Sequence, residues 1–104
     1  MGLDIATTTA ISGGVAQATV SDTALNFDDT AITVAEMAAA ARAIVFVRSG
    51  AINVYYDGTA PTTSTGLKFN TDDKFEILNS VDIGNFQMIR NGSTDAVVDI
   101  VLEN

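Results

Sequence analysis

Aspartates stand at the ends of several polar loops of this chain, and their carboxylates are the first groups to test for chemistry. The groups are Asp28-Asp29, Asp57 and Asp72-Asp73. Oxygens converging at loop ends could bind a hard cation such as Ca²⁺. None of the groups has the spaced Asp-x-Asp-x-Asp-Gly pattern of an EF-hand, and aspartate also favours turns because it hydrogen-bonds its own backbone. We therefore predict turn aspartates and no metal site, with Ca²⁺ binding as the alternative.

Groups for catalysis are scarce. The chain has no histidine and no cysteine, which removes the usual general base near neutral pH and the thiolate nucleophile. No serine lies in a Gly-x-Ser-x-Gly elbow, and a Ser-Lys pair would have to use Lys68 or Lys74 without any supporting pattern. Two carboxylates for glycoside cleavage are always available among 13 acidic residues, but no spacing selects one pair. We predict no enzymatic activity, no catalytic residue and no cofactor.

The segment from Tyr55 to Gly66, which reads YYDGTAPTTSTG, is a long loop of small residues that contains the only proline. Its conformation must be restricted, because Gly58 accepts a positive φ and Pro61 fixes its own φ. Gly66 allows an unusual φ where the loop ends. In a regular strand Tyr55 and Tyr56 point to opposite faces, so one belongs to the core and the other to the surface or an interface. The chain has no tryptophan, and no second aromatic residue follows at strand spacing, which argues against a sugar-binding platform.

This loop resembles a segment of small tailed-phage virion proteins, in which an (Asn/Arg)-x-Tyr-Asp-Gly-Thr-x-Pro-Thr-x-x-x-Gly stretch lies between two strands of a β-sandwich. Asn53 to Gly66 carry that segment here. The flanks are also similar: an Ala-Arg-x-(apolar)-x-(apolar) strand lies before it, at Ala41 to Val47, and a Phe-x-x-Ile-x-x-Gly element follows, at Phe86 to Gly92.

The resemblance implies a structural protein of the phage virion, foremost a capsid decoration or cement protein. Such a protein is made in the host cytoplasm, binds the outer surface of the mature head and stabilises it. Its implied partners are the major capsid protein and itself, as a homotrimer. The alternatives are a head-fibre base, a neck or tail component, or a free module that binds carbohydrate or a host surface.

Alternating apolar residues predict an all-β fold, a single antiparallel β-sandwich of jelly-roll-like or Ig-like type with about seven or eight short strands. Residues 34–41 favour a short helix, with Thr33 as its cap and Glu36 three residues further on. Residues 80–85 read as irregular. The expected strands include Leu25–Phe27, which ends at Asp28, and residues 42–48, 52–56, 67–69, 75–77, 86–89 and 96–102.

Turn residues and side-chain alternation predict the pairing and the core. Ser49-Gly50 closes a hairpin between two of these strands, and Asn91-Gly92 is the strongest hairpin signal of the chain. The expected core consists of Ile44, Phe46, Val54, Phe75, Phe86, Val98 and Ile100.

Residues 1–20 are an extended N-terminal arm or an edge strand, and residues 21–104 form the β-sandwich domain. The first part is rich in threonine, alanine and glycine and has no apolar face of its own. One interpretation makes Met1 to Ala18 an arm ordered by a neighbouring subunit through main-chain hydrogen bonds. The other makes Val15 to Val20 an ordinary strand of the same domain.

A chain of 104 residues forms one domain, and its composition favours contact with another protein chain. Apolar residues make up 47% and charged residues only 17%, so we expect part of the apolar surface to be covered by a partner. The net charge of −8 opposes binding to nucleic acid or anionic lipid. No apolar run approaches the ~18 residues of a membrane span, and no signal peptide is recognisable. The candidate interface residues are Leu3, Ile5, Ile11, Tyr55, Pro61, Val97 and Val101.

Overall fold

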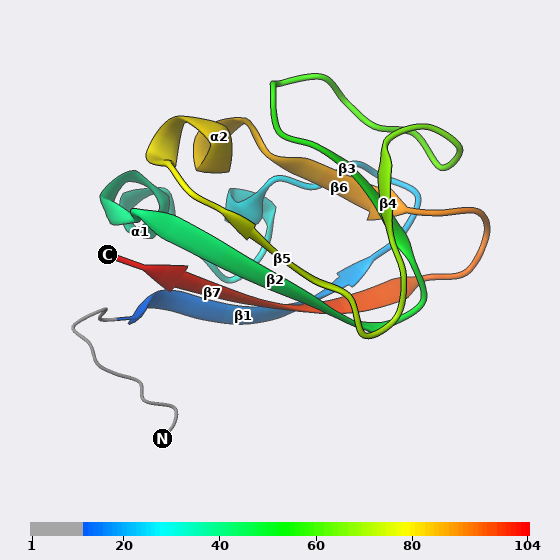
Figure 1. Ribbon diagram of the computed structural model, residues 1–104, viewed down its shortest axis with the longest axis horizontal. Coiled ribbons are helices and arrows are strands. Elements are labelled where there is room, and N and C mark those ends of the chain that lie inside the picture. The colour runs from blue at the N-terminus through cyan, green and yellow to red at the C-terminus, as the bar shows by residue number, and fades with distance from the viewer. Residues whose placement is uncertain (1–11) are drawn as a thin grey trace.

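The computed structural model describes residues 12–104, which form two antiparallel sheets packed face to face (Figure 1). The four-stranded sheet has the order β1-β7-β2-β5, and the three-stranded sheet has the order β4-β3-β6. The all-β, sandwich-like fold predicted from the alternating segments is therefore confirmed. The strands are β1 Ser12–Val20, β2 Arg42–Ser49, β3 Ile52–Tyr55, β4 Leu67–Phe69, β5 Lys74–Ile77, β6 Gln87–Arg90 and β7 Ala96–Glu103.

Two short helices lie at one end of the sandwich (Figure 1). Helix α1, Val34–Ala39, has the expected capping box, in which Thr33 Oγ1 accepts a hydrogen bond from the Glu36 N–H at 3.1 Å and Glu36 Oε1 accepts one from the Thr33 N–H at 2.8 Å. Helix α2, Ser80–Asn85, replaces the irregular segment expected there. Neither of these helices of the described chain is long and apolar enough to cross a membrane.

The expected strand at Leu25–Phe27 is wrong in its second half. Leu25 forms a single bridge to Met88, with two backbone hydrogen bonds of 2.8 Å. Phe27 then begins a 3-10 helix, η1 Phe27–Asp29, which Asn26 caps. This turn brings the Phe27 ring into the core, where it stacks on Phe86 with ring centroids 4.5 Å apart.

Both predicted hairpins are wrong, because the two turns carry the chain from one sheet to the other. The turn at Gly50 joins β2 of the four-stranded sheet to β3 of the three-stranded sheet, and the turn at Gly92 joins β6 to β7. Both glycines have the positive φ that the turns require, +73° and +76°. The sequence therefore predicts the positions of these two turns correctly. The partners of each strand depend on distant segments, since β2 pairs with β7 and β5.

The core lies between the sheets, and the predicted face of β2 is reversed. Val54, Phe86, Val98 and Ile100 are buried as predicted, and Phe75 is half-buried against them. Ile44 and Phe46 are only half-buried on the outside of the four-stranded sheet. The residues of β2 that face the core are the smaller Ala43, Val45 and Val47, all fully buried.

Strand β1 is an edge strand of the four-stranded sheet and pairs with β7, from Val15 opposite Val101 to Val20 opposite Ala96. The arm interpretation is therefore wrong for residues 12–18, which are ordered by their own domain. Ala16 and Val20 contribute to the core. Residues 1–11 of the expected arm lie outside the described residues.

Candidate functional site

The loop between β3 and β4 carries the phage-like motif, and it is held in one shape by its own hydrogen bonds. Asp57 Oδ1 accepts from the Thr59 N–H at 2.9 Å, and this backbone hydrogen bond lowers the pKa of Asp57. The backbones of Thr62 and Thr65 bond each other in both directions at 3.0 and 3.2 Å, and their hydroxyls are 2.7 Å apart. We call residues 57–66 the proline loop.

The proline loop is also anchored to the outer face of the three-stranded sheet through Asn53. This side chain is 1% exposed. Its amide donates to the Thr62 carbonyl at 2.8 Å, and its Oδ1 accepts from the Asn91 amide at 2.9 Å. Gly66 passes so close that an added Cβ would lie 2.9 Å from Asn53 Cβ. Pro61 is buried as well, so the loop presents an outer surface formed by Asp57 to Ala60, which are exposed.

The second candidate surface is the outward side of the four-stranded sheet, which we call the outer sheet face. Its middle is apolar, because Val15, Val101 and Ile44 lie in one row across β1, β7 and β2. Phe46 and Val97 extend this row along the strands. Val15 is 67% exposed and the other four are half-buried. Outward positions on a sandwich are usually polar, since only the inner face meets the core, so this apolar row is a candidate contact surface.

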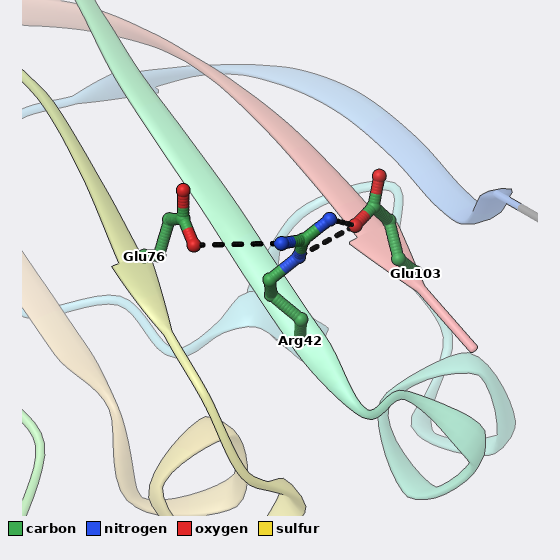
Figure 2. A network of polar contacts seen from close by, with 3 residues as sticks. All are labelled: Arg42, Glu76 and Glu103. Carbon is green, nitrogen blue, oxygen red and sulfur yellow. Dashed lines mark hydrogen bonds and ion pairs between the residues drawn. The ribbon is translucent and has the colours of Figure 1, made fainter. Parts of the chain in front are cut away.

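One end of the outer sheet face carries a network around Arg42, which is drawn in Figure 2. The guanidinium lies between Glu103 on β7 and Glu76 on β5, with Arg42 Nε 2.6 Å from Glu103 Oε1 and Nη1 3.6 Å from Glu76 Oε1. The hydrogen bond to Glu103, followed by the charge of that carboxylate, raises the pKa of Arg42. Two carboxylates share one guanidinium, so this end of the face has a net charge of −1.

The other end of the outer sheet face carries a cluster around Asp99. Gln17 donates to Asp99 Oδ1 at 3.0 Å, and Arg48 donates to Oδ2 at 2.9 Å. These hydrogen bonds, the one from Gln17 first, lower the pKa of Asp99. Lys74 stands in the same row of the sheet, next to Phe46. With Arg48, Lys74 and one carboxylate, this end has a net charge of +1.

The outer sheet face as a whole is therefore neutral, although the chain is strongly acidic. Its strands carry three basic residues, Arg42, Arg48 and Lys74, and three acidic ones, Glu76, Asp99 and Glu103. The other ten acidic and two basic residues of the chain account for the entire net charge of −8. Long-range repulsion between two copies of the chain is consequently weakest where these faces meet.

Three of the five aspartates considered as Ca²⁺ ligands accept hydrogen bonds within local turns: Asp29, Asp57 and Asp73. Asp29 Oδ2 accepts from the Asn26 N–H at 2.9 Å, and Asp73 Oδ2 accepts from the Asn70 N–H at 2.7 Å. Within residues 12–104, no group of three or more acidic side chains is arranged to hold a metal ion.

A shallow cleft runs along the open edge between β5 and β4. One part has a volume of about 330 Å³ and contains Leu78, Asn79 and Asp82, and an adjoining apolar part of about 110 Å³ contains Leu67 and Phe75. Tyr56, Glu76 and Ile77 line both parts. Three of its polar side chains are already used, because Asn79 and Asp82 bond each other to cap α2 and Glu76 pairs with Arg42. The cleft thus offers few free groups that would orient a small ligand.

The structure separates the residues that were predicted to form an interface. Val97 and Val101 lie on the outer sheet face, half-buried. Tyr55 is half-buried at the end of β3 in the other sheet, and Pro61 is buried inside the proline loop. The remaining three fall on residues outside the described part of the chain: Leu3, Ile5 and Ile11.

Sequence reasoning missed Ile44 and Phe46 as members of the outer sheet face, although a signal was present. Arg42 and Arg48 share the side of β2 on which Ile44 and Phe46 stand, because all four are spaced by two. Charged residues are almost never fully buried unless they are paired, so that side had to face outward. No family model matches this chain, and no curated protein and no solved structure matches it.

Proposed function

We propose that this chain is a structural protein of a tailed-phage virion that decorates the mature head, with the major capsid protein as its partner and the proline loop as its contact surface. The observation that carries the proposal is the bracing of residues 57–66, the segment in which the resemblance to virion proteins is strongest. Buried Asn53 and the paired threonines hold this loop before any partner is met. A loop that is already ordered loses little conformational entropy on binding.

The proposed action is stabilisation by mass action. A protein that binds only the expanded, mature lattice stabilises that state over the states it does not bind, by an amount that grows with its free concentration. Such an action requires a shaped surface and no catalytic group, which fits a loop built from small residues. Copies of the chain are the second proposed partner.

Co-sedimentation with purified phage heads tests this proposal. We expect the wild-type protein to sediment with mature heads and Ala60→Arg to lose most of its binding, because Ala60 is exposed in the proline loop and makes none of its internal hydrogen bonds. The matched control is Ala31→Arg, the same change at an exposed alanine in a different loop. Both variants are expected to melt as the wild type does.

The outcomes separate the alternatives. Binding to purified tails or necks in place of heads identifies a different virion component. Retention on a glycan array without heads supports a carbohydrate-binding module. Head binding that is unchanged by Ala60→Arg refutes the assignment of the proline loop as the contact surface.

A further inference from the structure

The outer sheet face carries opposite charges and apolar side chains at neighbouring positions of the same strands. Across β2 and β5 its middle rows read Ile44 next to Glu76 and Phe46 next to Lys74. The acidic end holds Glu76 beside the Arg42 network, and the basic end holds Lys74 beside Arg48. Glu76 and Lys74 stand two residues apart on β5, which is about 7 Å along the strand and less than the screening length of about 8–10 Å at ordinary salt. A surface therefore distinguishes these two charges only when it is in direct contact with them.

A second copy of the chain is the partner whose charges complement this pattern. Two such sheets can be stacked face to face about either of two axes that lie in the plane between them. An axis parallel to the strands places acidic end over acidic end. An axis perpendicular to the strands exchanges the ends, so that Glu76 of each copy lies over Lys74 of the other, and Ile44 of each lies over Phe46 of the other. The same axis places Arg42 over Arg48, and each of these arginines is already bonded to a carboxylate of its own copy.

We propose that the outer sheet face binds the same face of a second copy, about a two-fold axis perpendicular to the strands. The contact buries the apolar row that the isolated domain leaves at its surface, and it forms two Glu76–Lys74 pairs by symmetry. Asp99 enters the interface already bonded to Gln17 and Arg48, which reduces the penalty for removing its charge from water. Because the axis is two-fold, every contact between a residue of one copy and a residue of the other occurs twice in the interface.

The size of the face sets the expected strength. Four strands about 4.8 Å apart, each some seven residues long, make a face of roughly 20 by 23 Å. This is at the small end of specific protein interfaces. We expect a reversible dimer whose population rises with concentration and falls with added salt, because the charge pairs at the rim are screened.

Sedimentation equilibrium of the full chain over a range of concentrations is the first test. A monomer–dimer equilibrium supports the proposal. A monomer at every concentration refutes it, and a trimer refutes the two-fold pairing while fitting the homotrimer that the resemblance implies. None of these results depends on head binding by the proline loop, so this inference and the proposed function can fail separately.

Charge reversal on β5 is the second and sharper test. Lys74→Glu makes both ends of the face acidic, and Glu76→Lys makes both ends basic or neutral, so each variant alone places like charges together. We expect each to raise the dimer dissociation constant by at least about tenfold. Both positions are exposed, and the melting temperature of each variant checks that it is folded. The control is Lys68→Glu, the same charge change on exposed β4 of the other sheet, which should dimerise as the wild type does.

Mixing the two variants distinguishes complementary charge from a general loss of packing. Lys74→Glu and Glu76→Lys together restore opposite charges across the interface, so a mixed dimer should form more tightly than either variant does alone. Native mass spectrometry with one variant isotopically labelled resolves the mixed dimer by its mass. Dimers of unchanged strength in either single variant, or mixing that restores nothing, would overturn the proposal.

Discussion

The two sheets of the sandwich differ in how their outward sides are covered. On the three-stranded sheet the outward residues Asn53 and Ile89 are 1% and 6% exposed, and Asn53 is bonded to the proline loop. On the four-stranded sheet Val15 is 67% exposed, and Ile44 and Phe46 are half-buried. The chain therefore supplies its own cover, the proline loop, for one sheet, while the outward apolar residues of the other remain in contact with solvent.

This difference shows why an apolar strand cannot be equated with a buried one. Both sheets have apolar residues on their outward sides. Those residues stabilise the monomer only where another part of the chain covers them and removes them from water. The covered side uses a buried polar side chain, Asn53, to fix the position of its cover. The uncovered side uses surface ion pairs, which are each worth little to stability but give the surface a charge pattern that another molecule can recognise.

Truncation of a phenylalanine should have the largest effect on the free energy of unfolding, and its size should differ between the core and the uncovered side of the four-stranded sheet. Phe86 is fully buried and stacked on Phe27, so Phe86→Ala should lower the free energy of unfolding by about 3–5 kcal/mol. Phe46→Ala should lower it by less than about 2 kcal/mol, since its ring is half-exposed. Chemical denaturation at low protein concentration measures both. Equal losses would place Phe46 in the core after all.

Removal of Asn53 tests whether the cover of the three-stranded sheet depends on this one side chain. Asn53→Ala removes one of the two hydrogen bonds of the Thr62 carbonyl, which keeps the one from the Thr65 N–H, and leaves the Asn91 amide without its Asn53 partner. An unpaired buried polar group costs about 1–3 kcal/mol. The counterpart on the uncovered side is Gln17→Ala, which removes an exposed amide and should change the free energy of unfolding by within about 0.5 kcal/mol. A neutral Asn53→Ala would mean that the proline loop is held by other contacts.

Glycine substitution examines how tightly the proline loop lies against its sheet. Gly66 has φ +136°, and an added Cβ would lie 2.9 Å from Asn53 Cβ, so Gly66→Ala should destabilise the fold by more than about 1 kcal/mol. The control, Gly84→Ala, lies inside α2 with open space around it and should stabilise by about 0.5–1 kcal/mol, because alanine is the better helix former. Thermal unfolding of both variants should therefore shift in opposite directions. A destabilised Gly84→Ala would contradict this reading of the free space.

Acid titration addresses the uncovered side and has the smallest expected effect. Hydrogen bonds from Gln17 and Arg48 lower the pKa of Asp99 below its ordinary 3.8. Because the folded value is below the unfolded one, the stabilisation is fully present above the unfolded pKa and is lost as the pH falls through the folded pKa. The melting temperature of Asp99→Asn should therefore lie slightly below that of the wild type near neutral pH, and the two should converge well below pH 4. If the two melting temperatures still differ in acid, the effect of the substitution comes from packing and not from the ionisation of Asp99.

Much of the fold could be predicted from local signals. The alternation in β7 placed Val98 and Ile100 inside and Val97 and Val101 outside, and the Thr33–Glu36 pair predicted α1 with its cap. These features depend on residues within a few positions of one another, so the sequence displays them directly. Helix α2 carried a weaker signal of the same kind, with Asn79 as the cap of a turn that contains Gly84.

What the amino-acid sequence determined by itself was most of the strands, the restricted shape of the proline loop and the total charge, because strand periodicity, glycine and proline φ values and side-chain ionisation are local properties. The tertiary structure alone decided the partners of β2 and β3, since a Gly50 turn serves a hairpin and a change of sheet equally well. It also decided that three of five basic residues gather on one face with three acids, leaving that face neutral in an acidic chain. This balance of charge arises only when strands that are distant in the sequence become neighbours in the sheet. It cannot be seen in any short stretch of the sequence.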